Sequence, residues 1–227
     1  MKKYGTKYGG WTLPENLDIG TDSILYSAGV GEDISFDILM SANYDPQIVL
    51  IDPTAKAVKH WDEVQSFYQK GSDFTGNIQS DYLTNISEVR PNLSKFVYEN
   101  IGVWKEKGSL KFYKQENPNY VSQTLVEGMY GDIYDTVPVD TIQNIMKKHG
   151  HTTIDLLKLD IEGAEIEVLT QMLADKIYPR YLCVEFDLWL KGKDVYGHTH
   201  KLLQKLYDAG YKMVFEEAGN ITFHFLR

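Results

Sequence analysis

The alternation of short apolar runs with amphipathic stretches limits the fold of this chain more than any other feature. Apolar runs predict β-strands at Ser23–Ser27, Gln47–Ile51, Lys95–Asn100, Leu110–Tyr113, Ile154–Leu159, Tyr181–Phe186, Lys212–Glu216 and Ile221–Phe225. Apolar residues three or four positions apart predict α-helices at Ile34–Ala42, Ala57–Lys70, Val139–His149, Gly163–Lys176 and Thr199–Ala209. Strands that alternate with helices in this way are typical of an α/β protein with a parallel sheet.

The last two runs depart from this alternation. Only Glu217-Ala218-Gly219-Asn220 separates them, which is too short for a helical crossover, so they should pair antiparallel. The nearly continuous apolar character of several other runs favours a sheet that is covered on both faces. The sequence therefore predicts an α/β fold with a doubly wound, mostly parallel sheet and an antiparallel C-terminal edge hairpin. Residues 71–94 and 114–137 are expected to form loops or short helices over one end of this sheet.

Charge and composition argue against several classes of partner and site. The formal net charge of −9 disfavours nonspecific attraction to a nucleic acid or an anionic membrane, so neither is an expected partner. No run of about 18 apolar residues occurs, and the basic start of the chain lacks the apolar stretch of a secretory signal. We therefore expect a cytoplasmic protein. Cys183 is the only cysteine, which excludes an intramolecular disulfide and a cysteine-built zinc site.

A glycine-containing turn follows the first predicted strand. Gly29-Val30-Gly31 stands between this strand and a helix, where glycine permits a positive φ and lets a ligand approach without a Cβ in the way. Ile34 occupies the place of the third glycine of a dinucleotide fingerprint, and Glu32 and Asp33 would repel a pyrophosphate. The turn thus disfavours a nicotinamide cofactor. S-adenosylmethionine has no phosphate and carries two cationic groups, so it is compatible with an acidic rim.

Two further strands end in carboxylates. Asp52-Pro53 follows the second strand, 21 residues after Gly31, where a carboxylate can accept hydrogen bonds from both hydroxyls of a ribose. The alternative is that Asp52 only caps the next helix. Asp160 and Glu162 follow the strand that contains Lys158, and they should point into the same crevice. Glu165, by contrast, is expected to complement the positive end of the helix that follows.

These residues resemble the FkbM-type S-adenosylmethionine-dependent methyltransferases. The resemblance rests on Tyr8-Gly9-Gly10-Trp11, on the segment from Tyr26 to Asp37, on Ile51-Asp52-Pro53 and above all on the segment from Asp155 to Glu165. It implies a class I methyltransferase-like Rossmann fold and transfer of a methyl group to a hydroxyl of a sugar, glycan or related small metabolite. No internal repeat, low-complexity tract or proline-rich linker divides the chain, so we expect one domain over residues 1–227, with an N-terminal lid or substrate segment at 1–22 and a catalytic core at 23–227.

The resemblance assigns roles at individual positions. It implies Gly29 and Gly31 around the methionine part of the cofactor, Asp52 on the ribose, Asn100-Ile101-Gly102 near the adenine and Asp160 beside the transferred methyl. Ser27 stands where a carboxylate is usual in the broader class, so Glu32 or Asp33 is the alternative contact for the ammonium group. The expected cofactor-binding residues are Ser27, Gly29, Val30, Gly31, Glu32, Asp33, Asp52, Pro53, Ile101, Gly102, Asp160 and Glu162.

An alcohol is a poor nucleophile until its proton departs, so a general base should assist methyl transfer. Asp160 is the first candidate, His198 the second, and Glu185 at the end of the next strand a further one. A divalent cation held by Asp160, Glu162, Glu185 and Asp187 is an alternative that the sequence does not favour, because nothing in it fixes their mutual distances. His198 and His200 would not share a face of a helix, so a solvated loop is expected there rather than a transition-metal site.

The aromatic residues favour a small-molecule or carbohydrate acceptor, because flat rings pack on the apolar faces of sugars. Trp11 and Trp189 are the expected lid or acceptor contacts, with His200 as a further acceptor contact. Two other function classes stay open on the same fold: a nucleotide-cofactor-binding oxidoreductase and a noncatalytic binding module. The sequence does not predict the oligomeric state.

Overall fold

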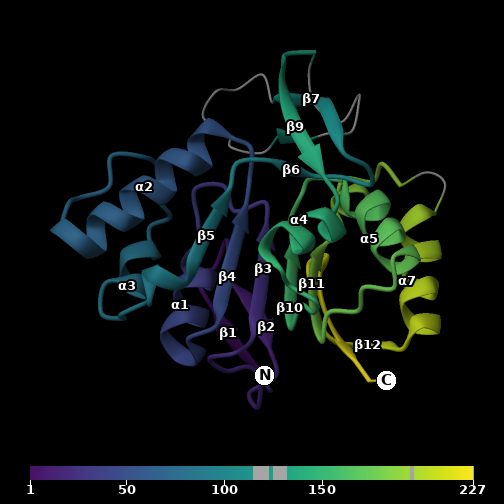
Figure 1. Ribbon diagram of the computed structural model, residues 1–227, viewed down its shortest axis with the longest axis horizontal. Helices are drawn as coiled ribbons and strands as arrows, with labels where there is room; N and C mark the ends of the chain where they lie inside the picture. Colours follow the sequence, from purple (N-terminus) through teal and green to yellow (C-terminus); the bar gives the residue numbers. More distant parts are fainter. Residues whose placement is uncertain (115–122, 125–131, 195–196, 227) are drawn as a thin grey trace.

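A seven-stranded sheet forms the centre of the computed structural model, which describes residues 1–114, 123–124, 132–194 and 197–226, without the side chains of 123, 189 and 190. Its strands lie in the order β12-β13-β11-β10-β3-β4-β5 (Figure 1). The bounds are β3 (Ile24–Ala28), β4 (Gln47–Ile51), β5 (Phe96–Glu99), β10 (Leu156–Leu159), β11 (Tyr181–Glu185), β12 (Tyr211–Glu217) and β13 (Asn220–Phe225).

The five strands from β11 to β5 are mutually parallel, as the alternation of strands and helices predicts. The C-terminal hairpin pairs antiparallel, also as predicted, but its place in the sheet differs. β13 pairs antiparallel with β11 as well as with β12, so β13 is the second strand and β12 is the edge. β12 consequently runs in the same direction as the parallel strands. The antiparallel element is therefore one inserted strand rather than a two-stranded edge.

Helices cover both faces of this sheet, and each face has its own hydrophobic core (Figure 1). Side chains of successive strand residues point to opposite faces, so Leu25 and Leu156 join one core while Tyr26 and Leu157 join the other. The first core contains residues of α1 (Ser35–Tyr44), α2 (Ala55–Lys70) and α3 (Tyr82–Ile86). The second contains residues of α4 (Ile142–His149), α5 (Glu165–Ala174) and α7 (His198–Ala209). The structure confirms a mixed α/β fold with a large, mostly parallel sheet.

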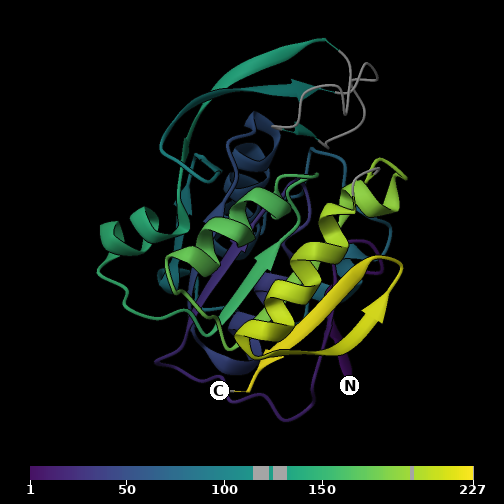
Figure 2. The same ribbon diagram turned by 90° about the vertical axis from the view of Figure 1, so that its right-hand side faces the viewer.

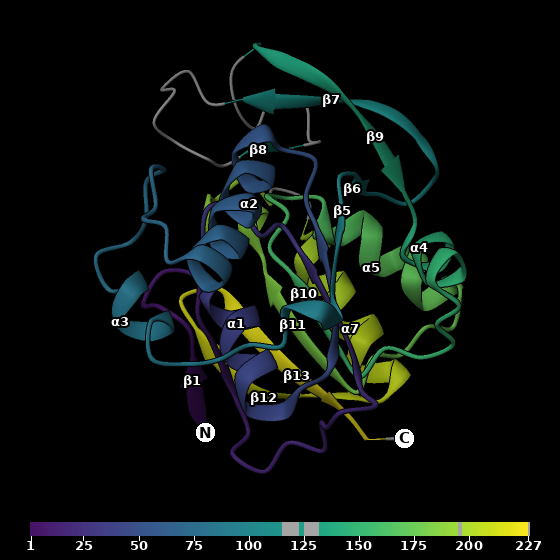
Figure 3. The ribbon, with the colours of Figure 1, turned by 60° about the vertical axis from the view of Figure 1, so that its left-hand side comes forward.

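A second, four-stranded sheet was not predicted. It has the order β6-β9-β7-β8, with β6 (Gly102–Val103), β7 (Gly108–Lys114), β8 (Gln123–Thr124) and β9 (Tyr134–Asp140). Figures 2 and 3 show it beyond the carboxyl ends of the main sheet, above α2 and α5. The expectation of loops or short helices over 114–137 is therefore wrong at three places, since Lys114 ends β7, residues 123–124 form β8 and residues 134–137 belong to β9. The helix expected from Val139 begins only at Ile142, because Val139 and Asp140 continue β9.

The remaining elements are short. β1 (Lys2–Tyr4) and β2 (Trp11–Leu13) form an antiparallel pair that packs on the core of α1, and neither was predicted. α6 (Asp187–Leu190) follows β11, and a 3₁₀ turn spans Leu93–Lys95. Within the described residues, no helix combines the length and the apolar character needed to cross a membrane.

His60 links α2 to α3 inside the first core. It is buried, and its Nε2 lies 2.8 Å from the hydroxyl of Tyr82. Burial lowers the pKa of His60 from 6.5 to about 4, so the imidazole is neutral at pH 7. A histidine whose pKa is lower in the folded state than in the unfolded state stabilises the fold at pH values above its unfolded-state pKa. This stabilisation is lost as the pH falls through the folded-state pKa.

Between pH 6.5 and pH 4, we expect the free energy of unfolding to fall more in the wild type than in His60→Gln. The additional fall in the wild type is at most about 3 kcal/mol. Glutamine retains a hydrogen-bonding group but does not titrate. Urea unfolding at a series of pH values measures the difference, with His198→Gln, a substitution of an exposed histidine, as the control. Parallel pH profiles for wild type and His60→Gln would contradict the assignment.

Candidate functional site

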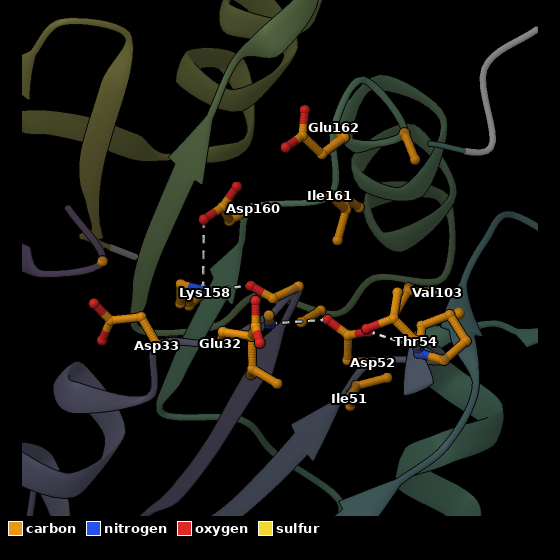
Figure 4. A pocket seen from close by; sticks show the side chains of 18 of the residues that line it. Glu32, Asp33, Ile51, Asp52, Thr54, Val103, Lys158, Asp160, Ile161 and Glu162 are labelled. Atoms are coloured by element: carbon orange, nitrogen blue, oxygen red, sulfur yellow. Dashed lines mark hydrogen bonds and ion pairs between the residues drawn. The ribbon is translucent and has the colours of Figure 1, made fainter. Parts of the chain in front are cut away.

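A cavity opens at the carboxyl ends of β3, β4 and β10, where the order of the parallel strands reverses. It encloses about 780 Å³ of empty space, including the part that is open to solvent. Its lining comes from six separated parts of the chain: Tyr8–Gly9, Ala28–Asp33, Ile51–Thr54, Gly102–Val103, Phe112, and Lys158 together with Asp160–Glu162 and Ala164. Figure 4 shows how Asp52, Asp160 and Glu162 surround it. The four segments around Gly31, Asp52, Gly102 and Asp160 therefore meet, as the strand-end pattern predicts.

The floor of the cavity is a close contact between two backbones. Gly29 has a φ of 75°, and a Cβ added there would lie 1.6 Å from the carbonyl oxygen of Asp160. The backbone N–H of Asp160 donates to the carbonyl of Ala28 at 3.1 Å, and the ammonium of Lys158 donates to the carbonyl of Gly29 at 2.7 Å. Lys158 is thus a buried cation that holds the turn. Its Nζ also lies 3.7 Å from Oδ2 of Asp160.

Asp52 supports the glycine turn from the neighbouring strand. Its Oδ2 accepts from the backbone N–H of Gly31 at 3.0 Å, and its Oδ1 accepts from that of Thr54 at 2.8 Å. The alternative role of Asp52, as the cap of the next helix, belongs instead to Thr54, whose hydroxyl accepts from Ala57 N at the start of α2. Burial raises the pKa of Asp52, while these donors oppose the shift. A carboxylate has further lone pairs, which leaves Asp52 able to bind a ligand in the cavity.

Glu32 and Asp33 differ in what their carboxylates contact, although both line the cavity. Asp33 accepts from the hydroxyl of Thr6 at 2.6 Å and from the backbone N–H of Ser35 at 2.9 Å. It therefore fixes the N-terminal segment to the start of α1. Glu32 is half-buried, and burial raises its pKa. Glu32 and Asp33 are the two alternatives for the carboxylate that Ser27 does not provide. Of these two acids, Glu32 makes fewer contacts with the rest of the protein.

Most of the expected cofactor-binding residues line this one cavity: Gly29, Val30, Gly31, Glu32, Asp33, Asp52, Pro53, Gly102, Asp160 and Glu162. Ser27 and Ile101 do not. Ser27 is buried within β3, beneath the turn, and Ile101 packs against the core of α4 and α5. Their sequence neighbours reach the cavity because alternate residues of an extended chain point to opposite sides.

Two further carboxylates, those of Glu185 and Asp187, lie beside Asp160. One oxygen each of Asp160, Glu185 and Asp187 lies within 4.8 Å of the other two. Burial and the neighbouring carboxylate of Asp160 raise the pKa of Glu185 to about 10, and burial together with Glu162 raises that of Asp187 to about 7. In the protein alone Glu185 therefore keeps its proton at neutral pH. Asp160 lines the cavity and Glu185 does not, so of these two acids Asp160 is the better placed to act as a base.

Glu165 connects the two loops that carry these acids. It is completely buried, its Oε2 accepts from Gly163 N at 2.8 Å, and its Oε1 accepts from Asp187 N at 3.1 Å. The expectation that Glu165 only complements the helix end is therefore incomplete. Sequence reasoning missed the second contact because Asp187 lies 22 residues away, after the next strand.

The two histidines begin α7, and they do not lie in the expected loop. Both are exposed, and neither lines the cavity. The backbone N–H of His198 donates to Asp194 Oδ1 at 2.6 Å, which fixes the start of the helix. The side chain of Trp189 lies outside the described residues. The structure thus brings Asp160 to the cavity and leaves His198 and His200 on the surface.

The N-terminal segment contributes a different aromatic residue from the one expected. Trp11 is 3% exposed and packs in the core around α1, whereas Tyr8 is 61% exposed and lines the cavity. Trp11 pairs with Tyr4 in the β1–β2 ladder, and this pairing turns its ring into the core. Phe112 of β7 is a second aromatic residue that the sequence analysis missed at the cavity.

Comparison with known families agrees with this geometry. The sequence model of the methyltransferase FkbM domain matches residues 14–213, which is most of the 227-residue chain. The chain belongs to the FkbM methyltransferase family. No curated protein and no solved structure matches it.

The FkbM domain match includes the glycine turn, Asp52, Gly102 and the acids after β10. Tyr8 and Gly9 precede the matched region. This FkbM-family methyltransferase therefore completes its cavity with an N-terminal segment outside the matched domain.

The contact between Gly29 and Asp160 predicts a large effect of one methyl group. We expect Gly29→Ala to reduce the free energy of unfolding by about 3–5 kcal/mol, because its Cβ would overlap a backbone oxygen that cannot rotate away. Gly31→Ala is the matched control: it also has a positive φ, but its Cβ would meet open space, so only backbone strain of about 1–2 kcal/mol is expected. Thermal and urea unfolding measure both. Equal losses in the two variants would contradict the packing described.

Proposed function

We propose that this FkbM-family protein is an S-adenosylmethionine-dependent O-methyltransferase that acts on a hydroxyl of a sugar, glycan or related small metabolite. One observation carries the proposal: the glycine turn, Asp52 and Asp160 face a single cavity at the point where the strand order reverses. Ligands of open α/β sheets bind in such crevices.

The residues present fit S-adenosylmethionine. Gly29 and Gly31 would border its methionine part, Asp52 its ribose, and Gly102 with Val103 its adenine. The carboxylates of Glu32, Asp52, Asp160 and Glu162 favour a cationic ligand, and Lys158 is the only basic residue among the described residues that line the cavity. This charge disfavours the pyrophosphate of a nicotinamide cofactor, which the alternative oxidoreductase would need.

S-adenosylmethionine supplies a methyl group bonded to a sulfonium, which makes the methyl carbon electrophilic. Most of the protein's contribution is then to align the acceptor oxygen and exclude water. Asp160 lines the cavity with its side chain about one third exposed, so a hydroxyl can reach it. We assign Asp160 as the base that takes the hydroxyl proton, and the ammonium of Lys158 lies 3.7 Å from its Oδ2.

The acceptor side of the cavity supports a carbohydrate-like substrate. Tyr8 and Phe112 come from the N-terminal segment and from the second sheet, and both line the cavity. Aromatic rings that are partly exposed offer apolar faces on which a sugar ring can pack. Carboxylates beside them can accept hydrogen bonds from the remaining hydroxyls. The acceptor is thus proposed to lie between the rings and Asp160.

Calorimetry should show binding of S-adenosylmethionine and of its demethylated product, but not of NAD. Asp52→Asn should weaken S-adenosylmethionine binding at least about tenfold, because the amide disturbs the contacts to Gly31 and Thr54 and removes a charge. Asp208→Asn, an exposed acid on α7, is the control and should bind normally. Binding of NAD in place of the two sulfur ligands would favour the oxidoreductase, and loss of neither ligand in Asp52→Asn would remove Asp52 from the site.

Asp160→Asn should lower methyl transfer about 10²–10⁴-fold, because an amide cannot take the hydroxyl proton. A panel of sugars and glycosides, with product detected by mass spectrometry, measures turnover, while calorimetry checks that the cofactor still binds. His198→Asn is the matched control and should retain turnover, since His198 does not line the cavity. The reverse pattern would transfer the role of base to His198. Cofactor binding without turnover across the whole panel would favour a noncatalytic module.

A further inference from the structure

A group of oxygen atoms lies beside the cavity, between the ends of β10 and β11. Asp160, Glu185 and Asp187 each contribute one carboxylate oxygen, and these oxygens lie within 4.8 Å of one another. Oxygen ligands on opposite sides of a bound Ca²⁺ are about 4.6–5.2 Å apart, and those around Mg²⁺ about 4.0–4.2 Å, given their bond lengths. Small side-chain rotations would therefore bring all three oxygens onto one divalent cation.

Two buried oxygens at this place have no hydrogen-bond partner among the described residues. One is Oδ2 of Asp187, a residue that is only 3% exposed. The other is Oδ1 of Asn220, which stands directly opposite Glu185 in the β11–β13 pairing. Residues opposite each other in an antiparallel pair project to the same face, so this oxygen lies on the side of Glu185. Buried polar atoms are nearly always satisfied, and a bound ion is one of the partners that account for the exceptions.

The neighbouring lysines leave part of this group unpaired. Lys191 lies 2.6 Å from Asp187, but on Oδ1, and it also contacts Glu162 at 2.5 Å. Within the described residues Glu185 has no ion pair at all. Oδ2 of Asp187 is thus available to a cation, and the side chain of Glu185, which is hydrogen-bonded to Asp160, can bind one once it has released its proton.

Glu165 adds rigidity to the same place. Its two oxygens hold Gly163 and Asp187 through their backbone N–H groups, which fixes the loop after β10 against the loop after β11. The three carboxylates are therefore held near one another before any ligand arrives. Preorganised carboxylates suit hard cations, whereas the absence of histidine and cysteine from the group disfavours zinc.

We propose that Asp160, Glu185 and Asp187 bind one divalent, oxygen-preferring cation of the Mg²⁺, Mn²⁺ or Ca²⁺ class. The three-dimensional arrangement supplies the mutual distances that the sequence could not. Asp160 also lines the cavity, so the cation would lie at its edge, where an acceptor hydroxyl could serve as a further ligand and lose its proton more readily to the second carboxylate oxygen of Asp160. That role in catalysis rests on the proposed methyltransferase function, whereas the binding site itself does not.

Titration of the whole purified protein with MnCl₂ tests the site, with free Mn²⁺ measured by electron paramagnetic resonance. The wild type should bind one equivalent with a dissociation constant below about 1 mM, and Glu185→Gln and Asp187→Asn should each bind at least about tenfold more weakly. Glu167→Gln, which removes an exposed acid of α5 that pairs with Lys105, is the control and should bind as the wild type does. Thermal unfolding with and without MnCl₂ provides a second readout, because a ligand that binds only the folded state raises Tm.

Absence of Mn²⁺ binding by the wild type up to 5 mM, or equal weakening in Glu167→Gln, would overturn the proposal and leave Lys191 as the counter-charge of the group. If Asp187→Asn fails to fold, Glu185→Gln decides alone, since Glu185 makes no ion pair within the described part of the chain. Calorimetry with S-adenosylmethionine on the same preparation separates the two proposals. Cofactor binding without Mn²⁺ binding removes only the cation site, and Mn²⁺ binding without cofactor binding removes only the proposed function.

Discussion

The contact between the backbones of Gly29 and Asp160 is the constraint on which the rest of the site depends. These residues follow neighbouring parallel strands, on the two sides of the point where the strand order reverses. Because Gly29 has no Cβ, the ends of β3 and β10 can approach each other closely. Asp160 can then donate a hydrogen bond to Ala28, and Lys158 can donate one to Gly29. Beyond this contact, the segments that follow β3 and β10 run in opposite directions along the sheet. The space between them becomes the cavity.

Buried carboxylates maintain the shape of that space. Asp52 holds the glycine turn through Gly31, and Glu165 holds the loop after β10 against Asp187. In each case two backbone N–H groups compensate the burial of the carboxylate, which would otherwise be costly. Asp160 and Glu162, the acids after β10 that line the cavity, therefore do not need to hold the loop against Asp187 themselves. This division of tasks is how an FkbM-family chain can concentrate negative charge at one edge of its sheet.

The sequence predicts the main sheet and the centre of the site well, because strands buried on both faces are apolar throughout and their carboxyl ends meet at one edge. The sequence does not predict the elements whose structure depends on tertiary contacts. Strand β9 is half exposed, contains Pro138 and pairs with a segment more than twenty residues away. The sequence therefore has no local apolar run that would predict this strand. Trp11 and Tyr8 are both aromatic residues beside glycines, and only the β1–β2 pairing decides which one is buried. The second contact of Glu165 likewise depends on a loop from another strand.

The position of β13 has a consequence for the order of assembly during synthesis on the ribosome. This strand separates β11 from β12, although it follows both in the sequence. Until residues 220–225 have been made, β11 has an unpaired edge, and the apolar side chains of Leu182 and Val184 have no neighbour on that side. β12 joins the sheet only through β13, so it must wait as well. The nascent chain therefore depends on protection of that edge until β13 emerges, in common with other proteins in which a later segment completes an open sheet.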